Sequence, residues 1–586
     1  MFDTFTQNYT PLGNEYVSAI FAAIPVLVLL LMLGVFRTAA HWAALGGLIS
    51  AFLVAILFYG MPAGLALSAG ANGAVFGLWP ITWIVINALF LHNLTVETGR
   101  FDIVRESLAS LTTDRRIQAI IIAFAFGALL EGIAGFGAPV AITAAIMASL
   151  GFNPLYAASI ALLANTAPVA FGSLGVPVTT LGGLVAPIVG NSDTGAVTNA
   201  LSAMIGRQLP LFSIIIPGFM IFVMAGWRGM MQVLPAVLTA GITFAVTQFI
   251  AANFLGPILV DVLAALVCLG ALVLLLRVWQ PATTWRFEDE PEEVAGSPST
   301  SAGRPASGPA SGFAAGAGSF GGGSSSFKAF LPYIILVVVV LIAKIESISK
   351  SIPDFLNVTA LLQKATIPIH WPSLHNLVIR VPPIVPSETP YPAVYNWDIL
   401  NAAGTVVLFA AIIAGFAMGA GPGTQLRVYG RTLNQLKYAI VTIAMILALA
   451  FIMNYSGATS TLGLAFAGTG VLFPFFSAFI GWLGVVLSGS DTSSNSLFGP
   501  MQTITAQQLG IDPALAGATN SSGGVMGKMI SPQNLTVGAS AIGQAGREPD
   551  IFRMTLKWSL ILTAAVGILA MIQAYLLPAI IPSLGG

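Results

Sequence analysis

Charged side chains are scarce in this chain of 586 residues. Lys, Arg, Asp and Glu make up 8% of it, while 56% is hydrophobic. Soluble globular proteins carry about 25% charged residues, so this composition excludes that class and indicates an integral membrane protein in contact with the lipid bilayer. The formal net charge is zero and no long basic run occurs, so the chain offers no electrostatic footprint for nucleic acid.

Cysteine and histidine are also rare. The single cysteine, Cys268, has no partner for a disulfide, and we interpret it as a packing or lipid-facing residue. The four histidines are scattered, and no Cys/His cluster has metal-ligand spacing. The chain contains no phosphate-binding loop and no dinucleotide fingerprint, which argues against ATP-driven pumping and cofactor chemistry. We therefore expect no metal, no cofactor and no enzymatic reaction.

Long hydrophobic runs dominate what is present. Because the start of the chain has no positive segment, we expect the first run to stay as a span and not to be a cleaved signal peptide. About 20 apolar residues are needed for a helix to cross the hydrocarbon. On this basis we predict complete spans at residues 17–36, 41–59, 79–96, 209–226, 233–251, 258–276, 330–343, 397–420, 438–453 and 551–577.

The positive charges predict the orientation of the spans. Acidic residues precede the first span and Arg37 follows it, so the N-terminus should face the periplasm. Two further spans then bring the arginine-rich segment 100–116 inside. The same count places residues 280–327 in the cytoplasm and residues 344–396 outside. The two long connections thus lie on opposite sides of the membrane.

Composition divides the chain into two membrane halves, residues 1–279 and 328–586. Residues 280–327 between them are rich in Ser, Gly and Pro after an acidic start, so we expect a disordered linker, either a passive tether or a regulatory segment. Residues 344–396 are rich in proline but also contain Trp and Tyr. We expect this segment to form an ordered external cap on the second half.

Two polar clusters interrupt apolar stretches, at residues 131–139 and 489–500. A charged group at membrane depth costs roughly 2.5–3.5 kcal/mol on insertion scales, so such groups usually mark a solute or ion pathway. A short match follows each cluster, because residues 150–154 read LGFNP and residues 509–513 read LGIDP. The predicted orientation makes the chain approach the two clusters from opposite sides. We therefore predict an all-α polytopic membrane protein with inverted repeats and re-entrant hairpins, as in secondary transporters.

The repeat extends further if one helical turn is inserted. Asn165 then falls on Asn520, and residues 137–139 (GAP), read as a corner, match residues 498–500 (FGP). Because Gly and Pro interrupt helices, we expect each helix to break within its polar cluster. Such a break survives at membrane depth only where it is buried or lines a polar cavity. Half-helix N-termini at a break carry partial positive charge, which suits a carboxylate.

These considerations predict a site for a small anionic substrate between the two hairpins. Its donors would be hydroxyl, amide and ammonium groups: Asn165, Thr166, Ser493, Ser494, Asn495, Asn520, Ser521, Ser522 and Lys528. Lys528 is the best charge partner for the substrate, and the alternative is a lysine that reaches to the interface. Asp491 and Glu131 are the candidate carriers of a coupling proton, because burial favours the neutral form of a carboxyl group; the alternative is that they cap broken helices.

The polar clusters resemble those of the bacterial lactate permease family. The most specific matches are GLWPITWIVINALF (77–90), LEGIAGFGAPVAIT (130–143), NTAPVAFGSLGVP (165–177), GSDTSSNSLF (489–498) and GKMISPQN (527–534). The resemblance implies proton symport of lactate and related 2-hydroxymonocarboxylates such as glycolate across the bacterial inner membrane, by an elevator-like movement. Where the family is expected to read NFxGPELPD, this chain reads NFLGPILVD, with Ile258 in place of an acid. If that acid served coupling, the role falls on Asp261 or elsewhere.

Three other interpretations compete with the proton symporter. Broken helices also build selectivity filters, so an anion channel is the main alternative, and a sodium-coupled carboxylate transporter would have the same fold. A membrane enzyme would need a nucleophile with a neighbouring base, and no such constellation occurs. Saturable counterflow would indicate a carrier, whereas unsaturated conductance would indicate a pore. The sequence does not determine the oligomeric state, and a homo-oligomer is one possibility.

Overall fold

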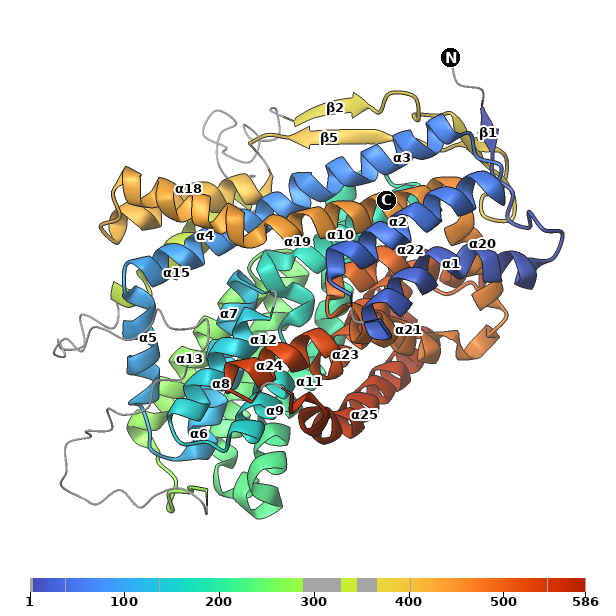
Figure 1. Cartoon of the computed structure of the whole chain (residues 1–586). Coiled ribbons are helices and arrows are strands. Elements are labelled where there is room, and N and C mark those ends of the chain that lie inside the picture. The colour runs from blue at the N-terminus through green and yellow to red at the C-terminus, as the bar shows by residue number, and fades with distance from the viewer. Residues whose placement is uncertain are drawn as a thin grey trace.

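A computed structural model describes residues 4–36, 38–135, 137–287, 328–344, 366–400, 402–544 and 546–584. Most of these residues are helical (Figure 1). The predicted linker is described only at 280–287, and the predicted cap only at 344 and from residue 366 on. The rest of both predicted segments lies outside the described residues.

The first half is built of helices apart from one short strand. In chain order its elements are β1 (Phe5–Thr6), α1 (Glu15–Gly34), α2 (Ala40–Leu57), α3 (Ala63–Phe76), the π-helix η1 (Gly77–Thr82), α4 (Trp83–Glu97), α5 (Arg100–Ala109), α6 (Arg115–Ala119), the π-helix η2 (Ile120–Phe126), α7 (Gly127–Ile133), α8 (Ala138–Ser149), α9 (Pro154–Ala164), η3 (Val169–Phe171), α10 (Gly172–Val189), α11 (Thr194–Gln232), α12 (Leu234–Phe254) and α13 (Val260–Val278).

The second half adds four strands to its helices. Its elements are α15 (Leu331–Lys344), β2 (Thr366–His370), β3 (Val378–Arg380), β4 (Thr389–Pro390), β5 (Val394–Asp398), α18 (Ala403–Ala417), α19 (Pro422–Ser456), α20 (Ala458–Ala467), η4 (Gly470–Leu472), α21 (Phe473–Ser488), α22 (Asp491–Gln508), α23 (Pro513–Gly527), η5 (Lys528–Ile530), α24 (Pro532–Ala541), α25 (Glu548–Tyr575) and η6 (Pro578–Ile580).

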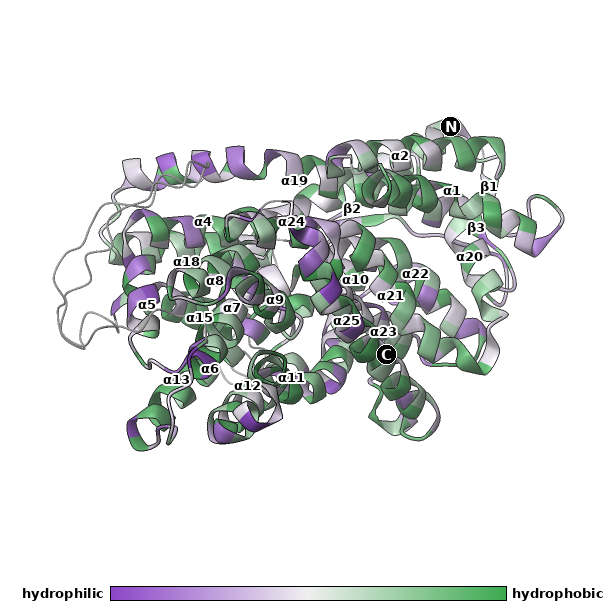
Figure 2. Cartoon of the chain, turned by 60° about the horizontal axis from the view of Figure 1, so that its bottom comes forward, coloured by the Kyte–Doolittle hydropathy of each residue, from purple (hydrophilic) through white to green (hydrophobic). Residues whose placement is uncertain are grey.

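The helices are long and apolar enough for a polytopic membrane protein. In the described part of the chain, 11 helical stretches could cross a membrane by length and composition. Outer helices expose large apolar side chains on the protein surface, among them Leu27 on α1, Leu53 on α2 and Leu274 on α13. The hydropathy colouring shows that most of the helices are rich in hydrophobic residues (Figure 2). Water would not support such surfaces, whereas lipid does.

Helices occur at all ten predicted spans, but two of them are not complete spans. The helices at 330–343 and 397–420 are α15 with 14 residues and α18 with 15, which is shorter than the roughly 20 residues that a crossing needs, and residues 397–398 belong to β5. Helix α11 has 39 residues and α19 has 35, so both extend well beyond the predicted stretches. Helix α3 was missed, because its glycines and short side chains lower the apparent hydropathy. It continues through η1 into α4 as one stretch, Ala63–Glu97. The stretch kinks at Trp79, whose carbonyl accepts a hydrogen bond from the Tyr395 hydroxyl on β5 (2.9 Å). Carbonyls freed at a kink need such partners.

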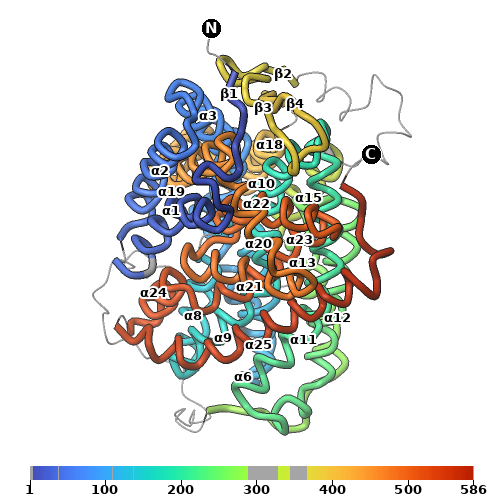
Figure 3. The backbone as a smooth tube through the Cα atoms, turned by 90° about the vertical axis from the view of Figure 1, so that its right-hand side faces the viewer, coloured from blue at the N-terminus to red at the C-terminus, as the bar shows by residue number. Residues whose placement is uncertain are grey.

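The described strands form two small sheets beside the N-terminal segment. Strand β1 pairs in parallel with β3, which pairs with β4, while β2 and β5 form an antiparallel pair. Figure 3 shows these strands gathered next to the N-terminus. The Trp371 indole donates to the carbonyl of Ser68 on α3 (3.1 Å), which ties the strands to the helices. The start of the chain and the strand segment therefore lie on the same side.

Two helical hairpins carry the predicted matching turns. Helices α8 and α9 meet at a turn with Gly151 at φ +98°, and α22 and α23 meet at one with Gly510 at φ +67°. Asn153 and Asp512 then cap α9 and α23 in the same way, each side chain accepting the backbone N–H two residues on. The same local physics thus builds both turns, since only glycine adopts a positive φ without strain.

Both polar clusters interrupt helices, but one predicted corner is wrong. Helix α7 ends at Ile133 and α8 begins at Ala138, with Gly137 at φ +82°. In the second cluster the break lies at Gly489 (φ +72°), between α21 and α22. Residues 498–500 form no corner, because α22 runs through Pro500 without a break. Buried helices of membrane proteins tolerate proline when neighbours satisfy the freed backbone groups.

Candidate functional site

A small polar cavity lies where the two broken regions meet. Its volume is about 50 Å³, and since roughly 10–15 Å³ accommodates one water, it accepts a molecule of a few heavy atoms. Its lining comes from the end of α7, the start of α10, the start of α22 and the segment around η5: Glu131, Val169, Gly172, Ser173, Val176, Pro177, Gly489, Ser490, Asp491, Thr492, Lys528 and Gln533. Two helix N-termini thus border the cavity, which favours an anion there.

The Lys528 ammonium is the cation of this cavity. Its Nζ donates to Glu131 Oε1 at 2.7 Å, and both side chains are buried. Glu131 Oε2 accepts a second bond, from Asn165 Nδ2 at 2.9 Å. An ammonium has three N–H donors, and among the described residues only one of them has a partner. The other two donors remain available at the cavity for a ligand oxygen.

Asp491 lies on the first turn of α22, and only one of its two carboxylate oxygens accepts hydrogen bonds from the described residues. Its Oδ2 accepts from the Ser521 hydroxyl at 2.6 Å and from Asn495 Nδ2 at 3.3 Å. Asn495 Oδ1 in turn accepts from Asn520 Nδ2 (2.8 Å), and Asn520 Oδ1 from Gln502 Nε2 (2.6 Å). Asp491 Oδ1 has no partner in the described part of the chain. This row of polar groups orients one carboxylate oxygen and leaves the other free.

Strained backbone lies beside the ion pair. Ser173 and Leu174, at the start of α10, both adopt positive φ (+47° and +57°). Such conformations cost about 1–3 kcal/mol each and gather at functional sites. Gly172 precedes them, and a Cβ placed there would lie 2.6 Å from Glu131 Oε1. The absence of a side chain at Gly172 therefore lets Glu131 reach Lys528.

The structure brings three predicted residues to the cavity wall: Lys528, Glu131 and Asp491. Four others support these charged groups without lining the cavity: Asn165, Asn495, Asn520 and Ser521. The remaining four lie elsewhere. Thr166 and Ser494 donate to the backbone carbonyls of Leu163 and Gly481, respectively. The backbone N–H of Ser493 is capped by the Ser490 hydroxyl, and the buried Ser522 hydroxyl has no partner among the described residues.

Sequence reasoning missed several residues of the cavity wall. Ser173, Ser490, Thr492 and Gln533 line it but were not predicted. Ser490 had a recognisable signal, because Ser before Asp-Thr-Ser is typical of a helix N-cap, and its hydroxyl caps α22. In the part of the chain that the structure describes, no three His, Cys, Asp or Glu side chains lie together as metal ligands.

Asp261, on which the sequence comparison placed the coupling role if the missing acid had served it, also belongs to this region. It lies in the first turn of α13, 1% exposed, and its charged neighbours are Glu131 and Lys528. Neither carboxyl oxygen has a hydrogen-bond partner among the described residues. Three carboxyl groups and one ammonium therefore share one buried cluster.

Comparison with known families matches residues 18–577 to the family described as L-lactate permease. The chain belongs to the L-lactate permease family. The resemblance inferred from the motifs is thus confirmed, and the protein is a permease and not an enzyme. With its many candidate spans it is a multi-pass membrane protein.

Two curated relatives match over almost their whole length. The glycolate permease GlcA of Escherichia coli (strain K12) is 45% identical over 577 residues, 98% of both chains. The L-lactate permease of Bacillus subtilis (strain 168) is 43% identical over 587 residues, 99% of this chain and 100% of that protein. Among solved structures, Neisseria gonorrhoeae MtrF resembles the chain with a TM-score of 0.43 at 12% identity, covering 86% of this chain and 84% of MtrF; this likeness is too weak to carry an argument.

Proposed function

We propose that this permease takes up lactate and related 2-hydroxymonocarboxylates such as glycolate across the bacterial inner membrane, each with a proton. The observation that carries the proposal is Lys528, a buried ammonium with two free N–H donors at a cavity of a few heavy atoms. A carboxylate matches that donor set. The names of the relatives, which differ between L-lactate and glycolate, support this substrate class.

The charges around Lys528 support coupling to protons. Glu131, Asp491 and Asp261 surround a single ammonium, so the fully ionised cluster would repel an anion. A buried ion pair is stable only when its charges balance. If the substrate carboxylate takes the place of Glu131 on Lys528, the released Glu131 needs a proton to stay buried. Substrate and proton then enter together, and the loaded cluster has the same charge as the empty one.

Each polar residue of the cluster has a role in this scheme. Asn165 holds Glu131 by its second oxygen and keeps it near the cavity when Lys528 is taken by substrate. Asp491 is the second candidate carrier of the proton, with Ser521 and Asn495 fixing one of its oxygens. The hydroxyls of Ser490 and Thr492 line the cavity and suit the 2-hydroxyl of the substrate.

The hairpins support alternating access by inverted repeats moving in an elevator-like way. Both hairpins have the same turn, and a 3₁₀ segment begins 15 residues after each turn proline, at Val169 after Pro154 and at Lys528 after Pro513. This equal spacing favours an alignment without the inserted helical turn. With the N-terminus outward, the strand segment that pairs with β1 is external as well.

Uptake of labelled L-lactate into proteoliposomes tests the proposal. Saturable accumulation driven by an inward proton gradient, with competition by D-lactate, glycolate and pyruvate, is the expected result. Accumulation under a sodium gradient but not under a proton gradient would show that sodium, and not the proton, is the coupling ion. Conductance of lactate that does not saturate would show that the protein is a channel and not a carrier. If none of these acids competes with lactate, the proposed substrate class is wrong.

A further inference from the structure

Asp261 is a carboxyl group in an unusual position. It lies on the first turn of α13, and a Cβ placed on Gly132, the residue after Glu131, would come within 2.8 Å of the Asp261 Cβ. Helix α13 therefore packs directly on the end of α7 that carries the ion pair. With 1% of its surface exposed and no donor to either oxygen among the described residues, the side chain has neither water nor a hydrogen bond to support a negative charge.

Few ionisable groups face Asp261. Within the described residues, η2, α10 and α12 pack on α13 and carry no Asp, Glu, His, Lys or Arg. Helix α7 brings Glu131 and η5 brings Lys528. Lys528 is bonded to Glu131 (2.7 Å) and makes no hydrogen bond to Asp261, so a single positive charge faces these two carboxyl groups. The neutral acid is the form of Asp261 that fits these surroundings.

We propose that Asp261 is a proton-binding site that exchanges its proton with Glu131, an inference that rests on the proposed symport. In the empty protein Glu131 is charged on Lys528 and Asp261 holds a proton. When a substrate carboxylate replaces Glu131, an O–H bond of Asp261 breaks and an O–H bond of Glu131 forms. Asp261 then regains a proton from a hydronium ion on the side to which the cavity opens: an O–H bond of that ion breaks, a new O–H bond of Asp261 forms, and a water molecule is left. One proton thus enters with each substrate.

The proposal explains why an acid lies so close to an ion pair that it does not join. A structural carboxyl at a helix start would accept the free N–H groups of the first turn, yet Asp261 accepts none. A second oxygen ligand for Lys528 would accept a bond from Nζ, and Asp261 accepts none. An isolated neutral acid beside an exchangeable carboxylate is what a proton relay requires.

The test uses Asp261→Asn in full-length protein reconstituted in proteoliposomes, with Asp193→Asn as the matched control. Asp193 caps α11 on the surface, and Asn retains the cap while removing the charge. We expect Asp261→Asn to lose the about tenfold accumulation that one unit of pH gradient supports, and to retain lactate counterflow, because exchange of loaded carriers needs no net proton movement. Asp193→Asn should match the unmodified protein in both assays.

Two outcomes would overturn the proposal. If Asp261→Asn accumulates lactate with the unmodified pH dependence, Asp261 carries no coupling proton. If counterflow is lost together with accumulation although the purified variant is folded, Asp261 serves substrate binding instead. Infrared difference spectra between the unmodified protein and Asp261→Asn provide a reading independent of transport: without lactate, the C=O band of a protonated carboxylic acid should be present in the unmodified protein and absent in the variant. Failure of the unmodified protein to use a proton gradient would instead refute the symport itself.

Discussion

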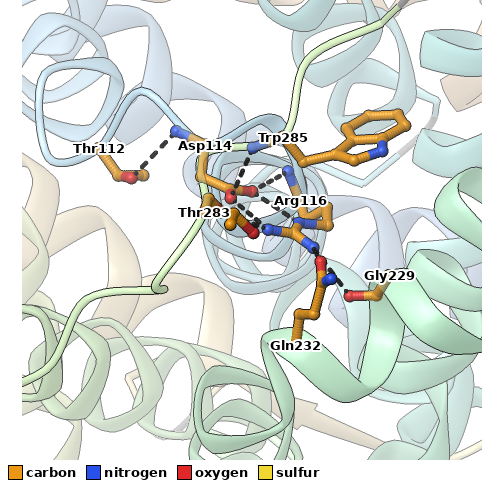
Figure 4. A network of polar contacts seen from close by, with 7 residues as sticks. All are labelled: Thr112, Asp114, Arg116, Gly229, Gln232, Thr283 and Trp285. Atoms are coloured by element: carbon orange, nitrogen blue, oxygen red, sulfur yellow. Dashed lines mark hydrogen bonds and ion pairs between the residues drawn. The ribbon is translucent and has the colours of Figure 1, made fainter.

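Two buried ion pairs of this protein, Asp114–Arg116 and Glu131–Lys528, differ in how completely their hydrogen bonds are satisfied. Arg116 has all five guanidinium N–H groups in use (Figure 4): two go to Asp114, two to the backbone carbonyls of Gly229 and Thr283, and one to Gln232 Oε1. Lys528 uses one donor of three.

The surroundings of the two pairs differ in the same way. Asp114 accepts four bonds with its two oxygens, including one from the backbone N–H of Trp285 (3.1 Å). The Lys528 cluster leaves unpartnered oxygens on Asp491 and Asp261 within the described residues. A saturated pair locks α6 to α11 and to the segment after α13, and it has nothing left to offer a ligand. An unsaturated pair at a cavity retains donors and acceptors for substrate and protons.

Removing Lys528 should have the largest effect on function. We expect Lys528→Ala to abolish lactate binding, because the substrate carboxylate loses the ammonium of the cavity and Glu131 loses its partner. Equilibrium binding of labelled lactate to purified protein measures this effect. Lys557→Ala is the control, since Lys557 lies over the ring of Trp558 and outside the cluster. Wild-type affinity in Lys528→Ala would place the substrate elsewhere.

Removing Arg116 should affect stability and not transport. Loss of one partner from a buried pair costs about 3–5 kcal/mol, so Arg116→Met should lower the thermal unfolding temperature strongly and reduce the yield of folded protein. The double variant Asp114→Asn/Arg116→Met should recover part of the loss, because no unpaired charge remains buried. The folded fraction should transport with an unchanged KM. A large increase in KM would give the Asp114–Arg116 pair a direct part in transport.

Gly172→Ala sharpens the comparison by moving Glu131 without removing it. Gly172 has φ −60°, which alanine adopts freely, but its methyl group would lie 2.6 Å from Glu131 Oε1. We expect KM for lactate to change roughly tenfold, equivalent to about 1.4 kcal/mol, with little change in stability. Gly270→Ala on α13 is the control, since nothing lies within 4 Å of its added Cβ. Identical kinetics of the two variants would contradict the proposed role of the ion pair.

The smallest effect is expected at an exposed pair. Glu97 bonds Arg427 (3.3 Å) and Arg431 (3.0 Å), whose side chains are more than half exposed. Such surface pairs contribute about 0–1 kcal/mol and are screened by salt. Glu97→Gln should therefore leave uptake unchanged and shift the unfolding temperature slightly, and only at low ionic strength. A loss of uptake would show that exposed charges also matter for transport.

Much of the local structure followed from the sequence. The runs of apolar residues predicted helices at ten spans, and the repeated L-G-x-[ND]-P turns appear where the motif stands, with glycine at positive φ and Asn153 or Asp512 as the cap. The predicted corner at residues 498–500 is wrong, because the helix breaks at Gly489 and α22 continues through Pro500. It also missed α3, because glycine and alanine give little hydropathy signal even in a buried helix.

The sequence by itself determined the membrane class, the positions of most apolar helices, the L-G-x-[ND]-P turns, the family and many residue types of the site, because these depend on residue types and on neighbours within a few residues. The tertiary structure decided which polar groups meet. Glu131 and Lys528 are 397 residues apart, and Asp261 comes from another helix, α13, whose motif did not reveal that it lies beside them. Packing between distant helices selects such partners, and a single sequence carries no signal for a contact whose two sides are set by different parts of the chain.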